Sequence, residues 1–224
     1  YSWNHTCGVT ADLLVFGDSH WVSAADRTVT GVTYNAVAMT YVRSDNNGYG
    51  RTTIFYMYAP TTGSAKSVAV TYSGTADCGF GGVVSYSGAK QSGQPDANNG
   101  AADHTTTATV TVTTVADNCW VFSVIYTWPA ITCGNTQRWN GIMYAGSNFH
   151  AGGSDTNAPK TPAGAQSMNW SLASDTWAIS AASFAPAATG WANIASINGV
   201  AAANIATVNG VAVAAIASIN GVAV

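Results

Sequence analysis

The chain has 224 residues, and its seven basic and ten acidic residues give a formal net charge of −3. Charged residues make up only 8% of the chain and the basic ones are scattered, so the basic surface that nucleic acid requires is not expected. Every acidic residue is Asp, Leu occurs at only three positions, and Thr, Val, Ala, Gly and Ser are abundant. Strand formers therefore outnumber helix formers, and the composition predicts an all-β fold.

The first half of the chain contains several runs that are typical of β-strands. Apolar or alternating residues predict strands in the segments 13–16, 28–42 (two strands around Tyr34-Asn35), 51–58, 67–72 and 82–86. Between two of them, Asp45-Asn-Asn-Gly-Tyr-Gly50 places oxygen-bearing residues in a way that resembles half of a calcium loop. It lacks the distal bidentate acid of such loops, so an Asx-type turn is the expected structure.

The second half of the chain continues this pattern after a polar stretch from Ser92 to Thr105, which predicts a long loop. Apolar residues then alternate with Thr from Ala108 to Thr113, which is clear strand periodicity. Further strands are expected at 120–126, 136–139, 142–144, 167–172 and 177–184. Eight to ten short strands separated by turns are typical of a two-sheet sandwich. The sequence therefore predicts a jelly-roll-like antiparallel β-sandwich over residues 1–188.

Residues 189–224 form a second region, an uncharged repeat segment. The pattern Ile-Ala-Ser-Ile-Asn-Gly-Val recurs with small changes every eleven residues, beginning at Ile194, Ile205 and Ile216. Each Asn-Gly favours a hairpin turn, with one β-strand between successive turns. Two alternatives stay open: a helix whose apolar stripe follows an eleven-residue repeat, and a membrane-spanning helix. Five Asn residues and the lack of flanking Lys or Arg disfavour the membrane span.

The repeat segment is expected to be covered by another molecule. Uncharged, β-branched segments without Pro associate edge to edge when they are exposed to water. Because the chain in front of the segment has the features of a complete domain, we expect the partner to be another copy of this chain. The interface positions that the repeat predicts are Ile194, Ile197, Val200, Ile205, Val208, Val211, Ile216, Ile219 and Val222.

The four cysteines, Cys7, Cys78, Cys119 and Cys133, are expected to form two disulfides. Cys119 and Cys133 flank a strong strand and would close a hairpin-sized loop, which leaves Cys7 to pair with Cys78. Four cysteines allow three connectivities, and locality alone favours this one. A zinc site is the alternative, but the chain has no C-x-x-C pair and its cysteine spacings do not suit zinc.

No catalytic, metal-binding or cofactor-binding site is expected. The four histidines are widely separated and no G-x-S-x-G motif is present, so Asp18-Ser-His20 is interpreted as turn residues rather than as part of a hydrolase. Glycosidases use two carboxylates, often Glu, and this chain has no Glu. Most of the eight Trp and ten Tyr residues lie in alternating strands and are expected in the core. Trp21, Trp128 and Trp139 have loop-like neighbours, which leaves glycans open as a partner.

Several phrases of the sequence resemble a known type of domain. They include Val32-Thr-Tyr-Asn35, Val84-Ser-Tyr-Ser-Gly88, Thr136-Gln-Arg-Trp139 and Ala182-Ser-Phe-Ala-Pro186. They look like a jelly-roll domain that recurs in secreted bacterial and phage surface proteins, over about residues 5–187. The Ile-Asn-Gly-Val repeats are similar to tails found on such proteins. The resemblance implies a fold and an extracellular compartment, and it transfers no catalytic residues.

The sequence thus predicts a structural subunit of an extracellular self-assembling filament, pilus-like or another surface polymer, in which the repeat segment packs against neighbouring subunits. A phage virion or tail surface protein and a carbohydrate-binding adhesive module are the alternatives. Four cysteines, few charges and a start at Tyr1-Ser-Trp3 without Met or leader predict a mature, secreted chain. Enzyme activity, a cofactor and membrane insertion are not expected.

Overall fold

The computed structural model describes residues 1–21, 27–74, 78–143 and 148–187, together with six two-residue strands between residues 196 and 223. The chain divides into two compact units, Tyr1–Ala185 and Pro186–Val224. We call the first unit the body, and the second unit contains the repeat segment.

The first two sheets of the body contain four antiparallel strands each, in the orders β1-β7-β3-β4 and β5-β6-β2-β8. β2 has no exposed residue, because its sheet is covered on both faces. The strands are β1 (Ser2–His5), β2 (Leu13–Trp21), β3 (Val29–Tyr34), β4 (Val37–Ala38), β5 (Thr40–Asn46), β6 (Gly50–Tyr58), β7 (Lys66–Tyr72) and β8 (Gly79–Tyr86).

The third sheet has the order β11-β14-β10-β13-β12, and β9 pairs with β14. All of these pairings are antiparallel. The strands are β9 (Ala97–Thr113), β10 (Trp120–Thr127), β11 (Ile131–Cys133), β12 (Thr136–Ile142), β13 (His150–Asp155) and β14 (Ala165–Phe184).

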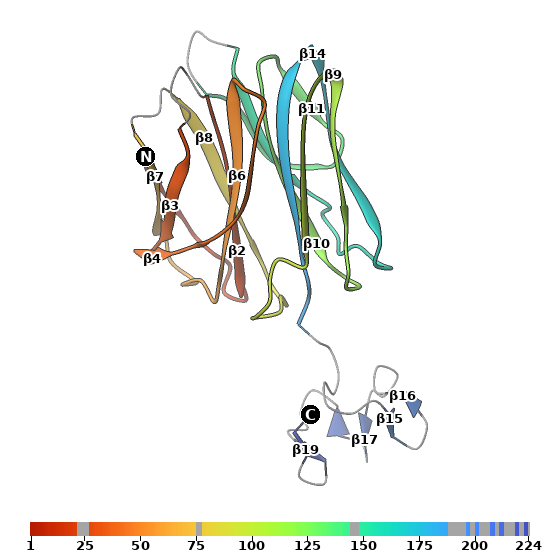
Figure 1. Cartoon of the computed structure of the whole chain (residues 1–224). Helices are drawn as coiled ribbons and strands as arrows, with labels where there is room; N and C mark the ends of the chain where they lie inside the picture. Colours follow the sequence, from red (N-terminus) through yellow and green to blue (C-terminus); the bar gives the residue numbers. More distant parts are fainter. Residues whose placement is uncertain are drawn as a thin grey trace. The chain divides into compact units, whose positions relative to one another are not determined.

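The long strands β9 and β14 pair in two stretches and double back together. Residues 165–171 pair with 107–113, and residues 175–183 pair with 97–105, with an irregularity between Ser171 and Asp175. The two stretches of β9 lie close together, because the Asn99 side-chain amide donates to the Thr111 carbonyl over 2.8 Å. In Figure 1, β14 correspondingly turns over at the end of the body where its label stands. The third sheet therefore forms two layers.

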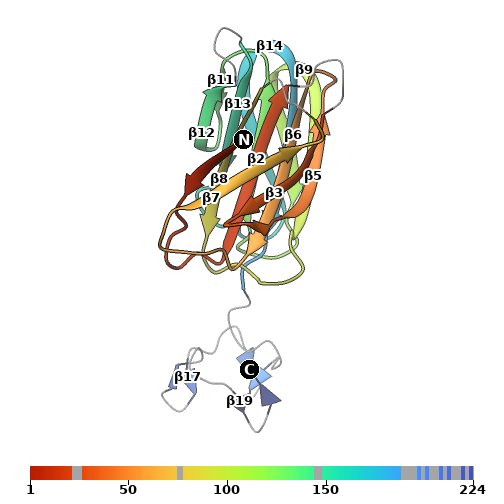
Figure 2. The same ribbon diagram turned by 90° about the vertical axis from the view of Figure 1, so that its left-hand side faces the viewer.

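Four apolar clusters fill the spaces between the layers. Alternate residues of β2 face opposite sides: Leu14 packs toward the first sheet and Val15 toward the third. Another cluster, around Trp170 and Ile125, fills the fold of the third sheet, and the fourth lies around Tyr126 and Phe149. Figure 2 shows the strands of the first sheet running obliquely across those of the second.

The prediction of an all-β antiparallel sandwich is confirmed. The strands are more numerous than expected, and the polar stretch 92–105, predicted as a loop, contains the first part of β9. That part was missed because it lies at a sheet edge with mostly exposed polar side chains, and only small residues such as Ala97 and Ala101 contact the core. The two strands expected around Tyr34-Asn35 are β3 and β4, joined by Asn35 and Ala36 with positive φ angles of 51° and 62°.

The repeat segment contains three small antiparallel pairs, one for each repeat. Ile197 pairs with Val200, Val208 with Val211, and Ile219 with Val222, so each Asn-Gly lies between two strands that pair with each other. The β interpretation is thus the one that the described residues support. The rest of each strand expected between successive Asn-Gly turns lies outside the residues that the structure describes.

Candidate functional site

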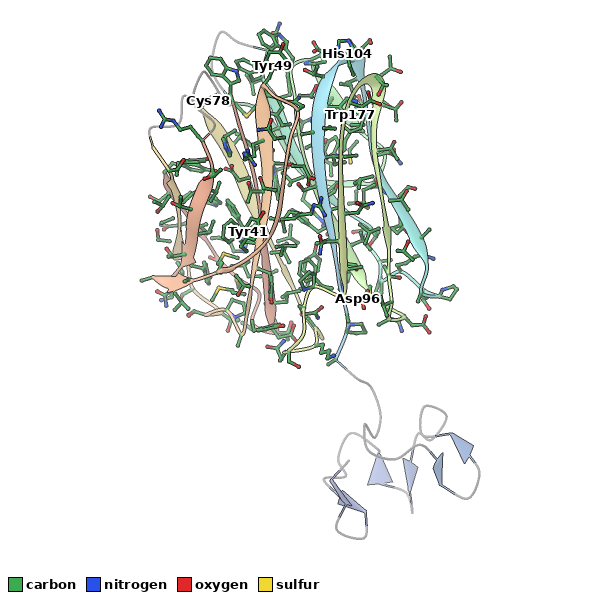
Figure 3. The ribbon with its side chains drawn as sticks, in the orientation of Figure 1. Tyr41, Tyr49, Cys78, Asp96, His104 and Trp177 are labelled. Carbon is green, nitrogen blue, oxygen red and sulfur yellow. The ribbon has the colours of Figure 1, made fainter. Side chains whose placement is uncertain are left out.

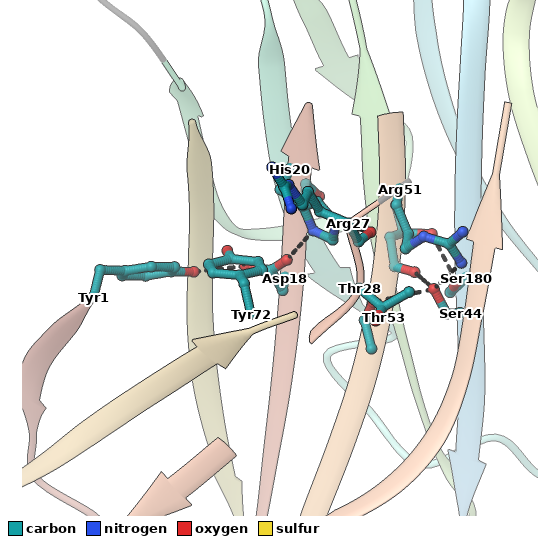
Figure 4. Close-up of polar contacts among 12 residues, drawn as sticks. Tyr1, Asp18, His20, Arg27, Thr28, Ser44, Arg51, Thr53, Tyr72 and Ser180 are labelled. Carbon is teal, nitrogen blue, oxygen red and sulfur yellow. Dashed lines mark hydrogen bonds and ion pairs between the residues drawn. The ribbon is translucent and has the colours of Figure 1, made fainter. Parts of the chain in front are cut away.

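A buried polar network connects the first sheet to the second. Asp18 and His20, on β2, are fully buried, and Asp18 Oδ2 lies 2.6 Å from His20 Nδ1. The hydroxyls of Tyr1 and Tyr72 both donate to Asp18 Oδ1, over 2.6 and 2.8 Å. Figure 4 shows the two tyrosines approaching the carboxylate. The prediction that Asp18-Ser-His20 belongs to a turn was wrong, since the three residues lie inside a strand.

His20 is not placed to activate a nucleophile, because its ring nitrogens already have partners in this network. Its Nε2 lies 3.0 Å from the Arg27 carbonyl oxygen, which can only accept, so Nε2 carries a proton. Its Nδ1 lies 2.6 Å from Asp18 Oδ2, so both ring nitrogens are engaged. Ser19 points the other way and donates to the Ile125 carbonyl. The pair therefore fastens sheets together and is not arranged as a hydrolytic dyad.

A second network connects the second sheet to the third. Arg43 binds both carboxylate oxygens of Asp45 over 2.7 Å, and its Nη1 donates to Asn98 on β9. The Ser180 hydroxyl, on β14, donates to Asp45 and lies 2.7 Å from the Thr52 hydroxyl. Ser44, Arg51 and Thr53 adjoin this network in Figure 4.

The segment that resembled a calcium loop is an Asx-type turn, as predicted. The Asn47 side-chain oxygen accepts from the backbone N–H groups of Tyr49 and Gly50, and that of Asn46 accepts from Gly48. Asp45, which would have been a calcium ligand, is held by Arg43 instead. Among the residues that the structure describes, no group of three or more potential His, Cys, Asp or Glu ligands occurs.

A third acid, Asp155, has no exposed surface; it is the last residue of β13 and pairs with Thr136 of β12. Arg138 Nε donates to Asp155 Oδ2 over 2.7 Å, and the Tyr86 hydroxyl donates to the same oxygen over 2.9 Å. Burial and the adjacent carboxylate raise the pKa of Tyr86 well above its usual value. This acid, like the first two, is therefore occupied in holding strands together.

The predicted disulfides are not present, because none of the four cysteines, all of which the structure describes, is disulfide-bonded. Cys7 packs with the cluster between the first and second sheets, Cys78 lies near Tyr126, and Cys133 packs against the cluster in the folded third sheet. The Cys119 thiol lies 3.4 Å from a carboxylate oxygen of Asp96.

The pairing of Cys119 with Cys133 was predicted from their closeness in sequence alone, and this prediction was wrong. The eight residues of β10 carry the chain about 26 Å away from Cys119, and the three residues of β11 do not bring it back. Cys7 and Cys78 likewise belong to different clusters.

Several aromatic rings gather where β2 and β10 end and β13 begins. Phe149 is the centre of this group: its ring centroid lies 5.1 Å from that of Trp21, which is stacked on it, and 4.4 Å from that of Trp128, which meets it edge-on. Tyr126 is the fourth ring, with a centroid 6.2 Å from that of Phe149. Trp128 is 44% exposed, although Phe149 is buried.

The turn between β5 and β6 belongs to the same end of the body, because Gly50 pairs with Trp21. A side chain at Gly50 would overlap the ring of Tyr126, so this position requires glycine. Tyr49, one residue earlier, is 57% exposed, and Figure 3 shows it at the tip of the body together with His104. We call this end, defined by Trp21, Tyr49, Trp128 and Phe149, the aromatic end.

The Tyr126 hydroxyl at this end is buried and has no hydrogen-bond partner among the described residues. Burial raises the pKa of Tyr126, and the charges of Cys78 and Asp175 raise it further. A shallow groove of about 410 Å³ lies close by, where β9 and β14 double back, and it is lined by Asp103, Thr105, Thr106, Thr107, Thr109 and Trp177.

Of the three Trp residues with loop-like neighbours, the structure brings Trp21 and Trp128 together and places Trp139 elsewhere. Trp139 lies in β12, half-buried against Phe122 at a centroid distance of 5.6 Å. Phe149 was not among the candidates, because no motif around it signals that two tryptophans distant in sequence will pack on its ring.

The structure describes only some of the predicted interface positions. Six of them lie in the paired strands of the repeat segment: Ile197, Val200, Val208, Val211, Ile219 and Val222. The other three, Ile194, Ile205 and Ile216, lie outside the described residues. Burial of these nine side chains between subunits therefore stays a prediction.

Comparison with known protein families, curated proteins and solved structures found no match to the chain. The resemblance to jelly-roll surface proteins accordingly stays a prediction beyond the sandwich fold itself. In the part of the chain that the structure describes, no helix is long and apolar enough to span a membrane.

Proposed function

We propose that this protein is a structural subunit that assembles with copies of itself through the repeat segment, in an extracellular filament or other surface polymer. One observation carries the proposal: the body has four apolar clusters of its own, whereas the described strands of the repeat segment pair only within single repeats. A unit that cannot cover its own apolar face is covered by its neighbours.

The energetics favour such an assembly. Full burial of a Val or Ile side chain contributes about 1.5–3 kcal/mol, so burial of even half of the nine predicted interface positions would make a strong contact. The segment carries no charge whose desolvation would oppose burial. Short strands with open edges also accept a neighbour through main-chain hydrogen bonds.

We further propose an extracellular location, supported by the low content of charged residues and the abundance of Thr and Ser. The free cysteines withdraw the support that disulfides would have given. A virion surface protein is the alternative, since it would use the same self-association. Electron microscopy of the purified assembly distinguishes a filament from a particle.

The proposal is tested by comparing the sedimentation of the full chain with that of a chain ending at residue 187. We expect the full chain to sediment as a polymer and the shortened chain as a folded monomer, with its strand content confirmed by circular dichroism. If the shortened chain still polymerises, the body makes the contacts and the proposal fails.

A further inference from the structure

The second stretch of β9, residues 107–113, forms an edge of the body. It pairs with β14 on one side and with no other described strand. Figure 2 shows β9 at the side of the body, next to β5. From Thr105 to Thr113 the strand contains only Thr, Ala and Val, so it has no charge, no Gly and no Pro. An uncharged, β-branched edge of this length associates with another strand unless something blocks it.

The other edges in the described part of the body are protected. β5 carries Arg43 and Asp45, and β12 carries Arg138. Each of these two strands also has a register irregularity, and charges and irregularities both hinder the pairing of an edge. The first stretch of β9 carries Asp103. β1, β4 and β11 have four, two and three residues, and β8 has no exposed residue. The second stretch of β9 lacks all of these features.

The backbone groups of Thr109 point out of this edge. The Asn99 side-chain amide donates to the Thr111 carbonyl, which therefore points away from β14. The N–H of Thr114 points the other way, because it donates to the Gly164 carbonyl on the β14 side. Along an antiparallel strand, the backbone groups of alternate residues point to the same side. The N–H and C=O of Thr109 consequently point away from β14, as those of Thr111 do.

Thr109 offers both of these groups to a partner. The outward carbonyls on either side of it are engaged, since Thr107 accepts from the Thr105 hydroxyl and Thr111 accepts from Asn99. No group among the described residues hydrogen-bonds to the outward N–H or C=O of Thr109. A residue of an added antiparallel strand exchanges two hydrogen bonds with a residue exposed in this way. The free part of the edge is thus centred on Thr109.

The shallow groove of about 410 Å³ lies along the same edge, because Thr107 and Thr109 belong to its lining. Trp177 also lines it, and the Trp177 Nε1–H already donates to the Thr105 hydroxyl over 3.0 Å. The threonine methyl groups and the Trp177 ring are apolar, so a Val or Ile side chain of an added strand fits beside them. Asp103, which lines the groove as well, disfavours an acidic strand.

The repeat segment of another copy has the properties that this edge requires. It carries no charge and is rich in Val and Ile, and each of its described strands has one described partner, which leaves its other edge open. A contact between two β9 edges, or between two repeat segments, uses the same surface on both copies and by itself closes a dimer. A contact between a repeat segment and a β9 edge joins two different surfaces and continues from copy to copy, as a polymer requires.

We propose that the second stretch of β9 accepts a strand of the repeat segment from a neighbouring copy, with Thr109 at the centre of the contact. The added strand exchanges main-chain hydrogen bonds with Thr109, and its apolar side chains pack along the groove. The sheet of one body thereby continues into the repeat segment of the next copy. This inference rests on the proposed function, because it names the surface to which the repeat segment binds.

The first test is Thr109→Pro in the full chain, with Thr109→Ala as the matched control. Proline removes the outward N–H and places its ring in the path of the added strand, but it costs no bond to β14. We expect the protein concentration at which half of the chains sediment as polymer to rise by about tenfold or more. Thr109→Ala keeps the backbone groups and should assemble as the wild type does. Circular dichroism and urea unfolding show whether each variant is folded. Normal assembly of folded Thr109→Pro, or an equal loss in Thr109→Ala, would overturn the proposal.

The second test is photo-crosslinking, which decides the matter even if the proline variant does not fold. Full chains with p-benzoylphenylalanine at position 109 are assembled with wild-type chains labelled with ¹⁵N, irradiated and analysed by mass spectrometry. We expect cross-links to labelled peptides from residues 189–224. The same group in place of Tyr41, which is 54% exposed on β5, is the control and should not reach the repeat segment. Cross-links from position 109 only to body peptides, cross-links only within one chain, or no cross-links would each contradict the proposal.

The two proposals fail in different ways. If the chain ending at residue 187 is a monomer but Thr109→Pro assembles normally, the repeat segment binds elsewhere, and only the assignment of the β9 edge is lost. If the chain ending at residue 187 still polymerises, the proposed function itself fails, and the assignment of the β9 edge fails with it.

Discussion

The body and the repeat segment differ in their charged residues and in the sequence separation of the residues that they join. In the body, buried or partly buried acids join strands that are far apart in sequence: Asp18 accepts from Tyr72, and Asp45 accepts from Ser180. In the repeat segment, no charged residue is present, and each described pair joins residues three to five positions apart, as Ile197 and Val200 do.

This difference shows that the two regions specify structure by different means. The body requires most of its length before its networks and clusters exist, so its fold is unique but sensitive to single buried changes. The repeat segment obtains its structure from a turn repeated three times, and its apolar residues are left for a partner. A charge added to the repeat segment should therefore weaken assembly. A charged side chain removed from the interior of the body should lower the stability of the body.

The largest effect is expected from a charge placed in the repeat segment. Ile205→Asp puts an unpaired carboxylate at the centre of the proposed contact, where desolvation opposes burial, and should abolish most of the assembly that sedimentation detects. The thermal unfolding of the body should not change. Val9→Asp, at a position that is 79% exposed in the body, is the matched control and should assemble normally. Normal assembly of Ile205→Asp would contradict the comparison.

A buried charge removed from the body should cost about 3–5 kcal/mol of stability. Asp18→Ala leaves His20 and the hydroxyls of Tyr1 and Tyr72 without their acceptor in a site that is fully buried. Asp18→Asn keeps an acceptor and should cost less, about 1–3 kcal/mol. Urea unfolding curves measure both. Equal stability of the wild type and Asp18→Ala would mean that the network does not hold the sheets together.

Alkaline pH should unfold the body by ionising its buried tyrosines. Burial raises the pKa of Tyr34 and Tyr56 to about 12, above the usual value of 10.0, and it raises the pKa of Tyr72 as well. The unfolded chain therefore loses these protons first, so the stability that they contribute is complete below pH 10 and is lost as the pH rises through the folded-state pKa. Tyrosinate absorbance should show a step that coincides with loss of the strand signal; ionisation of every tyrosine with the strands intact would contradict this.

The smallest effect concerns the cysteines. Burial raises the pKa of the Cys119 thiol to about 12 and also raises those of Cys7 and Cys133, so little thiolate is present at mildly alkaline pH. We expect these three residues to resist iodoacetamide in the folded protein. All four cysteines should be alkylated after denaturation without a reductant, as mass spectrometry would show. Resistance that persists in denaturant until a reductant is added would restore the disulfides.

The sequence predicts the fold well where residues alternate. The second stretch of β9, from Ala108 to Thr113, has one apolar side, and its burial follows that pattern. β6 also alternates in sequence, but both of its faces are buried. The first stretch of β9 has no such alternation, because it lies at an edge, and it was predicted as a loop. The layering was also missed, since nothing in the residues near Ser171 indicates that β9 and β14 double back together.

The aromatic end and the polar networks were predicted less well, for a physical reason. Trp21 and Trp128 were recognised one by one from their loop-like neighbours, but their meeting on Phe149 depends on the register of three strands. Asp18 and His20 were interpreted as turn residues because polar side chains are rare inside a strand buried on both faces. Their partners, Tyr1 and Tyr72, are too distant in sequence for any local pattern to connect them.

The position of β14 has a mechanical consequence. Its second stretch pairs with β9 on one side and β10 on the other, and the chain leaves the body directly after it. If a pull is applied through the chain at Ala185 while the aromatic end is held, the force runs lengthwise along both ladders. Hydrogen bonds loaded in this way must yield together rather than one after another, which raises the barrier to forced unfolding. The body is thus built to carry tension between its two ends.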